Sequence, residues 1–167
     1  MLRKNPELRM EMGSGSFAIV ASRYNAHYVD PMLRAAKAEL WRANASRIQI
    51  VRVPGAYEIP LAAARLAKTA TRLTDAAPRL SAIICLGVIL RGETVHAAHI
   101  GEAVSRALME IQLAHEIPVI HEVLLLENEE QARVRCLNPK HNRGTEAAQV
   151  ALAMVRVMKK LNSENAV

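Results

Sequence analysis

The sequence predicts an α/β fold built around one parallel sheet. Short apolar or alternating runs, typical of strands, take turns four times with longer segments whose apolar residues recur at helical spacing. The run SAIICLGVIL (81–90) is apolar along nearly its whole length, as expected of a strand that helices cover on both faces. The 167 residues suffice for one domain with a substantial core, and no repeat or linker divides them.

The first half of the chain supplies two strands and two helices. FAIVAS (17–22) is a short apolar run, and RIQIVRV (47–53) alternates as a strand does. Between them, DPMLRAAKAELWRA (30–43) predicts a helix that starts with Asp30 as N-cap and Pro31 at the first helical position. A turn and a second helix follow, with a proline suited to that helix's first turn.

The second half repeats the alternation. A connection over 69–80 leads into the apolar strand at 81–90, and a helix then runs from about residue 96 to 116. The remaining predicted elements are a strand at 117–126, a short helix at 127–136 with acidic residues in its first turn, and a long helix at 142–161.

Charge and aromatic content narrow the range of partners. The net charge is +6, and the aromatic residues are one Trp, three Tyr and one Phe. A basic chain suits small anionic substrates, but scattered charges without stacking aromatics do not predict a nucleic-acid surface. No apolar run reaches the roughly 18–20 residues that span a bilayer, so no membrane segment is expected.

The chain ends and the cysteines fit a cytoplasmic protein. The first residues carry charges and no apolar leader, so we expect a mobile arm over 1–16, one domain over 17–162 and a tail over 163–167. Cys85 lies in the apolar strand and Cys136 near a helix end, where packed, reduced thiols are expected rather than a disulfide.

The segments that follow the strands carry the unusual residues. Ligands of parallel sheets bind beyond the carboxyl ends of the strands, where this chain has SRYN, VPGAYE, RGETVH and ENEE. The dinucleotide motif GxGxxG, the phosphate loop GxxxxGK[ST], the zinc motif HExxH and the hydrolase motif GxSxG are all missing. We therefore expect a composite site built by several loops.

The segment RGETVHAAHI (91–100) admits several interpretations. A helix start offers backbone N–H groups to an anion, so a phosphate could sit at Glu93 and Thr94, with an ordinary capped helix as the alternative. His96 would be a proton donor or acceptor beside such an anion, or else a solvated side chain. His96 and His99 could share a helix face and bind a metal, but no third ligand has supporting spacing.

Other strand-end residues also have two interpretations. Glu58 could accept hydrogen bonds from a polyol or an amine, or compensate a helix dipole. Tyr24 and Tyr57 could stack on a planar ring or simply pack. Candidate cations for a phosphate or a carbonyl, with surface charge as the alternative for each, are Arg91, Arg135, Lys140 and Arg143.

Five segments together carry a family likeness: RYN (23–25), VPGAYEIP (53–60), GVILRGETVH (87–96), ENEEQA (127–132) and HNRG (141–144). In this order they resemble the signatures of the 6,7-dimethyl-8-ribityllumazine synthases of riboflavin biosynthesis. The likeness covers about residues 17–161, and the combination of the second and third segments is the most specific part of it.

The resemblance implies a flavodoxin-like three-layer α/β/α sandwich with a four-stranded parallel sheet. It implies a transferase that condenses 5-amino-6-(D-ribitylamino)uracil with 3,4-dihydroxy-2-butanone 4-phosphate, giving 6,7-dimethyl-8-ribityllumazine, phosphate and water in the penultimate step of riboflavin biosynthesis. The family needs no metal or organic cofactor, and its sites lie between neighbouring subunits of a homopentamer. Riboflavin synthase is the implied protein partner.

The resemblance also assigns roles at the reacting centre. His96 matches the proposed proton-transfer histidine, Glu93 and Thr94 match the phosphate loop, and Arg135 matches its cationic partner.

A larger set is matched to ribitylaminouracil. Its members are Tyr24, Ala56, Tyr57, Glu58, Val88, Ile89, Leu90, His121 and Arg143. Tyr24 is the stacking aromatic, the segment after the second strand holds the ribityl chain, and the end of the third strand reads the pyrimidine edge through its backbone. Arg143 falls where the family has a lysine or arginine near the pyrimidine carbonyl, and His121 stands where many members place an aromatic contributed across the interface.

The chain departs from the family pattern in three places. Ala97 and Ala98 replace an aromatic residue and an aspartate, so His96 lacks its customary acid. His121 replaces a flat apolar ring with a titratable one. The loop CLNPKHNRG (136–144) lacks the glycines common in sixty-subunit shells, which favours a pentamer or two stacked pentamers. These departures leave one alternative open, a weakly active or inactive paralogue that binds flavin or lumazine.

Overall fold

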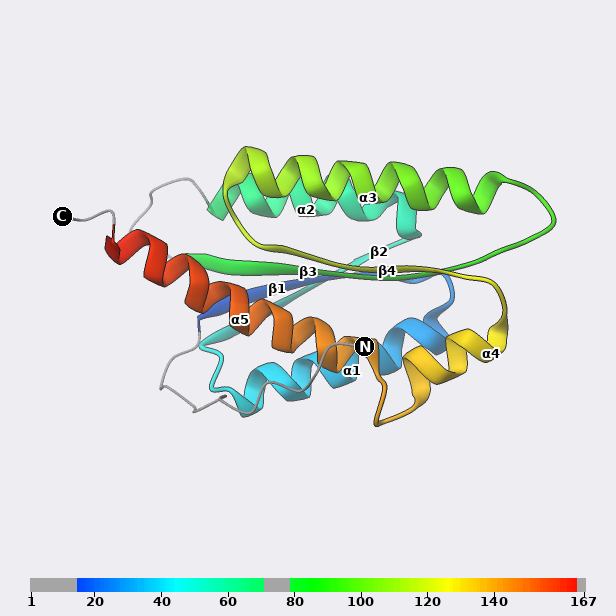
Figure 1. Ribbon diagram of the computed structural model, residues 1–167, viewed down its shortest axis with the longest axis horizontal. Helices are drawn as coiled ribbons and strands as arrows, with labels where there is room; N and C mark the ends of the chain where they lie inside the picture. The colour runs from blue at the N-terminus through cyan, green and yellow to red at the C-terminus, as the bar shows by residue number, and fades with distance from the viewer. Residues whose placement is uncertain (1–14, 71–78, 165–167) are drawn as a thin grey trace.

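A four-stranded parallel sheet forms the centre of the structure, with helices on both of its faces (Figure 1). The computed structural model describes residues 15–70 and 79–164. The strands are β1 (Ser16–Ser22), β2 (Arg47–Val53), β3 (Leu80–Leu90) and β4 (Val119–Leu126). The helices are α1 (Ala26–Arg42), α2 (Ile59–Ala70), α3 (His96–His115), α4 (Glu129–Ala132) and α5 (Arg143–Glu164), with a 3₁₀ turn η1 (Ala56–Glu58) and a π-helical turn η2 (Arg133–Leu137).

The strand order is β2-β1-β3-β4, and every pairing is parallel. Helices α1 and α5 cover one face of the sheet, and α2 and α3 cover the other (Figure 1). This arrangement confirms the predicted three-layer α/β/α sandwich. Among the described residues, no helix combines the length and the apolar character that crossing a bilayer requires.

The burial of strand β1 explains why its sequence is apolar between its two terminal serines. All seven of its residues are buried, because the sheet has a helical layer on each side. Phe17, Ile19 and Ala21 belong to the core shared with α1 and α5, whereas Ala18 and Val20 belong to the core shared with α2 and α3. Alternate side chains of one strand therefore supply both cores.

The predicted start of the first helix is wrong. Helix α1 begins at Ala26, after Asn25, which takes the left-handed conformation with φ 56° and ψ 36°. Asp30 is not an N-cap. Its Oδ1 forms an ion pair with Nη1 of Arg52 in β2, at 2.6 Å. Pro31 lies in the second turn, where it removes one backbone donor without ending the helix. An Asp-Pro pair can stand at the start of a helix or in its second turn. Here the helix starts after Asn25, which places the pair in the second turn.

The other predicted elements form within a few residues of their expected ends. The strand expected at 47–53 has those bounds, and the long last helix continues to Glu164. The short helix after β4 continues as a wider, π-helical turn at η2. The expected N-terminal arm is described only at residues 15–16, the tail only at 163–164, and the connection between α2 and β3 lies largely outside the described residues.

Small residues let α5 lie close against α1. Ala147, Ala148 and Ala151 are fully buried between the two helices and the sheet. At Gly144, an added Cβ would lie 2.5 Å from the carbonyl carbon of Met32 in α1, which is backbone and cannot swing aside. This approach fixes where the first turn of α5 lies, and with it the position of the residues that begin the helix.

Candidate active site

The strand order reverses between β1 and β3. The chain leaves β1 for β2 on one side and returns as β3 on the other side of β1, which is where open parallel sheets bind ligands. Pairing of β1 with β3 ends at Ala21 and Leu86, although β3 continues to Leu90. The last residues of β3 therefore extend past the end of β1 and face the loops that follow β1 and β2.

The loop after β1 is held by hydrogen bonds to the neighbouring strand ends. The Tyr24 N–H donates to the Pro54 carbonyl at 2.9 Å, and the Asn25 side chain donates through Nδ2 to the Val88 carbonyl at 2.9 Å. The Tyr24 ring is 72% exposed, so it projects into solvent and can meet a planar ligand. The Val88 carbonyl, expected to read a pyrimidine edge, already accepts from Asn25 and keeps one lone pair.

The turn η1 holds the residues expected to bind a ribityl chain. Ala56 is buried, whereas Tyr57 is 64% exposed and Glu58 is exposed. Glu58 Oε2 accepts the Gly55 N–H at 2.8 Å, which supports the capping interpretation of this carboxylate. Its other oxygen has no partner among the described residues and remains an acceptor for a hydroxyl, so the two interpretations are compatible.

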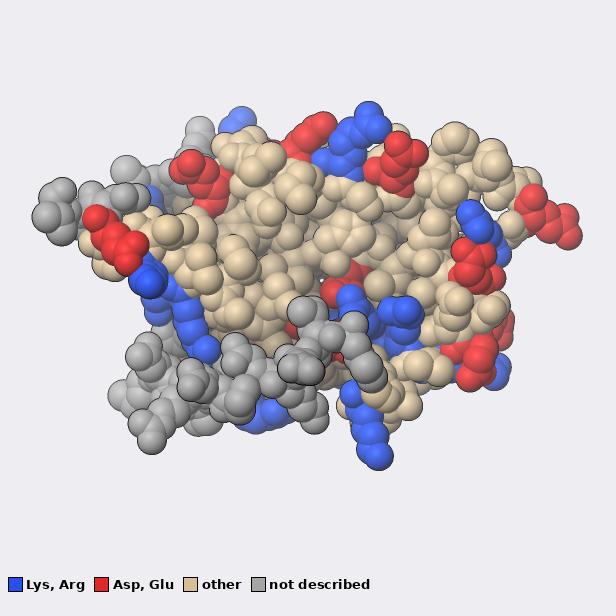
Figure 2. Space-filling view, viewed as in Figure 1, with Lys and Arg blue, Asp and Glu red and all other residues tan. Residues whose placement is uncertain are grey.

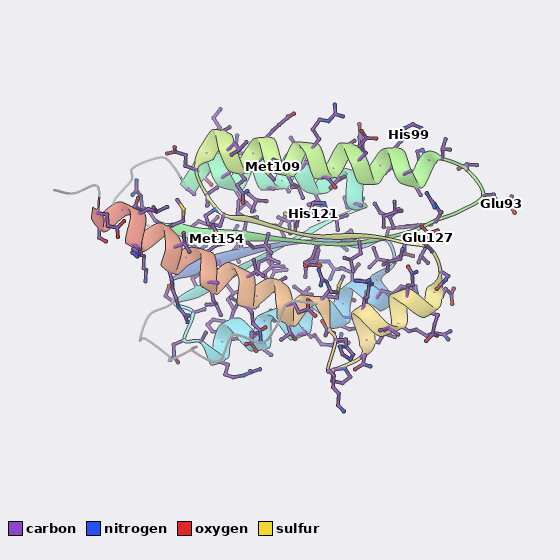
Figure 3. The ribbon with its side chains drawn as sticks, viewed as in Figure 1. Glu93, His99, Met109, His121, Glu127 and Met154 are labelled. Carbon is purple, nitrogen blue, oxygen red and sulfur yellow. The ribbon has the colours of Figure 1, made fainter. Side chains whose placement is uncertain are left out.

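The segment after β3 leads directly into α3. Glu93, Thr94 and His96 are all exposed, and His96 is the first residue of the helix. The His99 N–H donates to the Val95 carbonyl, so the N–H groups of the first helical residues lack intrahelical acceptors and can meet an anion. Figure 3 shows Glu93 at the outer end of this segment.

Arg91 joins the two strand ends beside this segment. Its Nη1 contacts both oxygens of Glu127, at 3.0 and 3.1 Å, and its N–H donates to the Leu126 carbonyl. Arg91 therefore brings the ends of β3 and β4 together. Its charge is already compensated, which makes it a poor candidate for a phosphate-binding cation.

His121 does not lie with the strand-end residues. It is the third residue of β4, opposite Cys85 of β3, and Figure 3 shows it well away from Glu93. Its Nε2 lies 2.8 Å from Ser105 Oγ of α3, and that hydroxyl donates to the Gly101 carbonyl. The exposed His121 ring thus stands at the outer strand of the sheet, on the α3 side.

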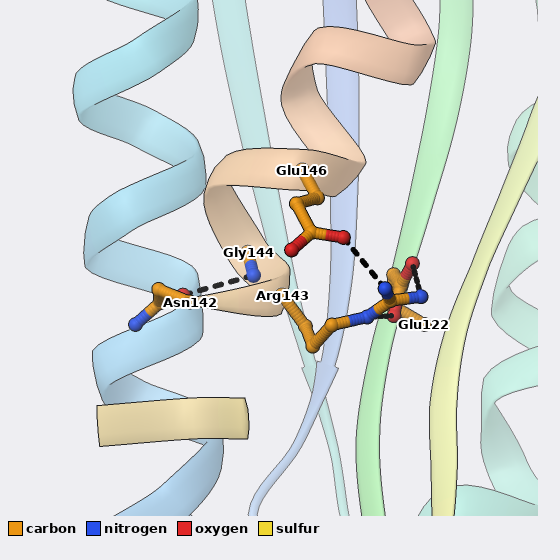
Figure 4. A network of polar contacts seen from close by, with 5 residues as sticks. All are labelled: Glu122, Asn142, Arg143, Gly144 and Glu146. Carbon is orange, nitrogen blue, oxygen red and sulfur yellow. Dashed lines mark hydrogen bonds and ion pairs between the residues drawn. The ribbon is translucent and has the colours of Figure 1, made fainter. Parts of the chain in front are cut away.

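On the opposite face of β4, Glu122 and Arg143 form a second group (Figure 4). Arg143 donates from Nε to Glu122 Oε2 at 3.0 Å and from Nη2 to Glu122 Oε1 at 2.9 Å, and its Nη1 lies 2.6 Å from Glu146 Oε2. The Glu122 side chain is 7% exposed, and the Arg143 side chain is 30% exposed. The two acids therefore hold three nitrogens of one guanidinium.

Burial and pairing act against each other in this group. Burial raises the pKa of Glu122 above its ordinary value, and the opposing hydrogen bond and charge of Arg143 only partly offset that effect. Burial also works against the charge of Arg143, but the hydrogen bonds and charges of Glu122 and Glu146 raise its pKa overall. The guanidinium therefore stays charged and is held tightly by both acids.

Arg135 differs from Arg143 in its surroundings. It is exposed on η2 and forms no hydrogen bond or ion pair with another described residue. Its charge is nevertheless near enough to Glu122 to favour the ionised carboxylate. Beside it, Cys136 is buried, and burial raises the pKa of its thiol to about 11. The predicted packing role of both cysteines is confirmed, since Cys85 is also fully buried and neither forms a disulfide.

The structure thus divides the predicted site residues into two sets. The strand-end set is Tyr24, Ala56, Tyr57, Glu58, Val88, Ile89, Leu90, Glu93, Thr94 and His96. The β4 set is His121, Arg135 and Arg143. No hydrogen bond or ion pair between described residues joins one set to the other. In residues 15–70 and 79–164, no three His, Cys, Asp or Glu side chains come together as metal ligands.

Sequence reasoning missed Asn25 and Glu122. Asn25 could have been found as an αL-tolerant residue in the loop after the first strand. Glu122 had a clearer signal, because a single acid inside the apolar run IPVIHEVLLL needs a buried cationic partner. The sequence gives no signal for which of the basic residues is that partner.

Comparison with known proteins identifies the family. The family model described as 6,7-dimethyl-8-ribityllumazine synthase matches residues 14–159. A protein of that name from Stenotrophomonas maltophilia (strain R551-3) is 39% identical over 150 residues, which cover 89% of this chain and 92% of the relative. Another, from Xanthomonas euvesicatoria pv. vesicatoria (strain 85-10), is 37% identical over 147 residues, covering 87% and 90%. The chain therefore belongs to the 6,7-dimethyl-8-ribityllumazine synthase family.

Proposed function

We propose that this chain is an active transferase that condenses 5-amino-6-(D-ribitylamino)uracil with 3,4-dihydroxy-2-butanone 4-phosphate to give 6,7-dimethyl-8-ribityllumazine, phosphate and water. The observation that carries the proposal is the family match over nearly the whole folded chain, including both sets of site residues. The exposed tyrosine, the free carboxylate oxygen and the open helix start at the strand ends support it.

Ribitylaminouracil would occupy the ends of β1, β2 and β3. Tyr24 is the proposed stacking partner of the pyrimidine, because its ring is exposed beside the end of β3. The segment Ala56–Glu58 would hold the ribityl chain, with Glu58 accepting hydroxyl hydrogens through the oxygen that does not cap Gly55. Backbone groups of Val88–Leu90 would read the pyrimidine edge.

Butanone phosphate would lie at the start of α3. Backbone N–H groups at Glu93 and Thr94 and in the first turn of the helix suit a phosphate, and Arg135 would supply the cation. The primary amine of one substrate attacks the ketone of the other to form an imine with loss of water. Phosphate then leaves by elimination, and ring closure releases a second water. His96, at the same helix start, is the proposed proton carrier for these steps.

No hydrogen bond or ion pair between described residues joins the strand-end set to the β4 set, and assembly with a neighbour would complete the site. Helix α3, strand β4 and helix α5 leave apolar side chains exposed, and Figure 2 shows mostly uncharged surface over these elements. The exposed apolar residues on them include Met109, Leu113, Leu125, Val150 and Val157. We infer that this face packs against another copy, so that His121 and Arg143 act at an interface between subunits.

The expected assembly is a homopentamer or two stacked pentamers, and not a sixty-subunit shell. Light scattering should give five or ten times the 18.4 kDa of one chain. The same proposal makes the cytoplasm the compartment and riboflavin synthase, which consumes the lumazine, the protein partner.

Turnover tests the proposed reaction directly. Purified protein with both substrates should release phosphate and form the fluorescent lumazine in equal amounts, well above the uncatalysed background. Mixtures lacking either substrate are the controls. Tight riboflavin binding without turnover would overturn the proposal and identify a flavin-binding protein instead.

A further inference from the structure

Glu122 on strand β4 and Arg143 at the start of α5 form an ion pair with two parallel hydrogen bonds. Glu122 presents both carboxylate oxygens to Arg143, at 3.0 and 2.9 Å, and thereby fixes the plane of the guanidinium. Glu146 takes the remaining terminal nitrogen. A buried ion pair on a strand is often no more stabilising than apolar packing, so orientation of Arg143 is the more telling consequence of the pair.

The charges of this group exclude one role for Arg143. One guanidinium is matched by two carboxyl groups, so the cluster has no positive charge left to offer a phosphate dianion. A guanidinium has five N–H groups, and three contacts with carboxylates leave two of them. The Arg143 side chain is 30% exposed, so these two can reach a ligand.

We propose that Glu122 is a positioning residue, which fixes the plane of the Arg143 guanidinium so that its two remaining N–H groups are directed at a neutral carbonyl of the pyrimidine substrate. This inference rests on the proposed function, since it names which substrate the Glu122–Arg143 pair serves. A neutral oxygen can accept an N–H bond beside two carboxylates, whereas a phosphate would be repelled by them.

The test compares the two Michaelis constants of the full-length protein. Glu122→Gln keeps the size of the side chain but turns one acceptor into an N–H donor that faces Arg143. We expect the KM for ribitylaminouracil to rise about tenfold, as for loss of a hydrogen bond to a charged group, and the KM for butanone phosphate to stay within about twofold. Arg135→Ala should show the reverse pattern.

Two further variants separate positioning from folding. Glu122→Asp keeps the buried charge with a shorter reach, so it should remain folded and raise the KM for ribitylaminouracil by about threefold. Glu39→Gln is the matched control, because Glu39 is also a buried acid paired with an arginine, at 2.7 Å from Arg42, but lies on α1 away from the site residues. Both of its Michaelis constants should match those of the wild type.

Three outcomes would overturn the inference. Glu122→Gln could raise both Michaelis constants equally, or raise only that for butanone phosphate, or leave both unchanged while lowering stability. If the wild type shows no turnover, the proposed function fails separately. Fluorescence titration with 6,7-dimethyl-8-ribityllumazine then tests Glu122 alone, because Glu122→Gln should still weaken binding about tenfold and Glu39→Gln should not.

Discussion

Replacing Gly144 with alanine tests the close approach of α5 to α1. The new Cβ would lie 2.5 Å from the carbonyl carbon and 2.7 Å from the Cα of Met32, whereas ordinary contact begins at 3.4 Å. The helices would have to separate by about 1 Å, and a gap of that size forfeits a quarter to a half of the dispersion energy across it. Because Ala147, Ala148 and Ala151 are fully buried in the same contact, we expect the free energy of unfolding to fall by about 3 kcal/mol or more.

Urea unfolding followed by far-UV circular dichroism measures this loss, at one fixed subunit concentration because assembly affects stability. Gly101→Ala is the matched control, since Gly101 is also helical but its added Cβ would meet only Leu125 side-chain atoms at 3.6 and 3.7 Å. That change should be neutral or stabilise by about 0.5–1 kcal/mol through helix propensity. If the free energy of unfolding of Gly144→Ala lies within about 1 kcal/mol of the wild-type value, the described contact between α1 and α5 is wrong.

Three further predictions follow from the site and the core. His96→Ala should lower kcat about 10²–10⁴-fold with little change in the KM for ribitylaminouracil, and unchanged steady-state kinetics would remove His96 from the mechanism. Cys85 and Cys136 are fully buried, so an aromatic disulfide reagent at pH 8 should label both thiols in denaturant and neither in the folded protein. Burial raises the pKa of Glu122, so the folded state binds its proton more tightly than the unfolded state does; the free energy of unfolding should fall as pH rises from 4.5 through the raised pKa, and urea titrations of Glu122→Gln should lack that part of the slope.

The fold was predictable because its signals are local and repeated. Every residue of β1 and most residues of β3 are buried. Each of these strands is therefore visible in the sequence as a short run of mainly apolar residues. The start of α1 was not predictable in the same way. Asp30 and Pro31 form a standard helix opening, but Asn25 starts the helix earlier while its side chain binds the distant Val88 carbonyl. A contact between residues so far apart in the chain leaves no trace in the local pattern.

The location of the strand-end candidates was also predictable, because parallel topology alone brings the ends of β1, β2 and β3 to one edge of the sheet. The β4 half was not. His121 and Glu122 are neighbours in the sequence, yet strand geometry sends them to opposite faces, toward Ser105 of α3 and Arg143 of α5. Which face each residue takes depends on the register of β4, which the sequence constrains only through its apolar neighbours.

The ion-pair partners of the basic residues determine what these residues can bind. The sequence shows how many basic residues there are but not which acids they pair with. From the sequence, Arg91, Arg135, Lys140 and Arg143 were all candidate cations for a phosphate or a carbonyl. Two carboxylate oxygens contact Arg91, and two acids hold Arg143, whereas the exposed side chains of Arg135 and Lys140 form no hydrogen bond or ion pair with a described residue. An arginine already compensated by carboxylates contributes direction to a hydrogen bond, and one without a partner contributes charge. A ring with neutral carbonyls and a phosphate ester make these two different demands. We therefore infer that the arrangement of the acids, more than the number of arginines, would separate the binding of the two proposed substrates.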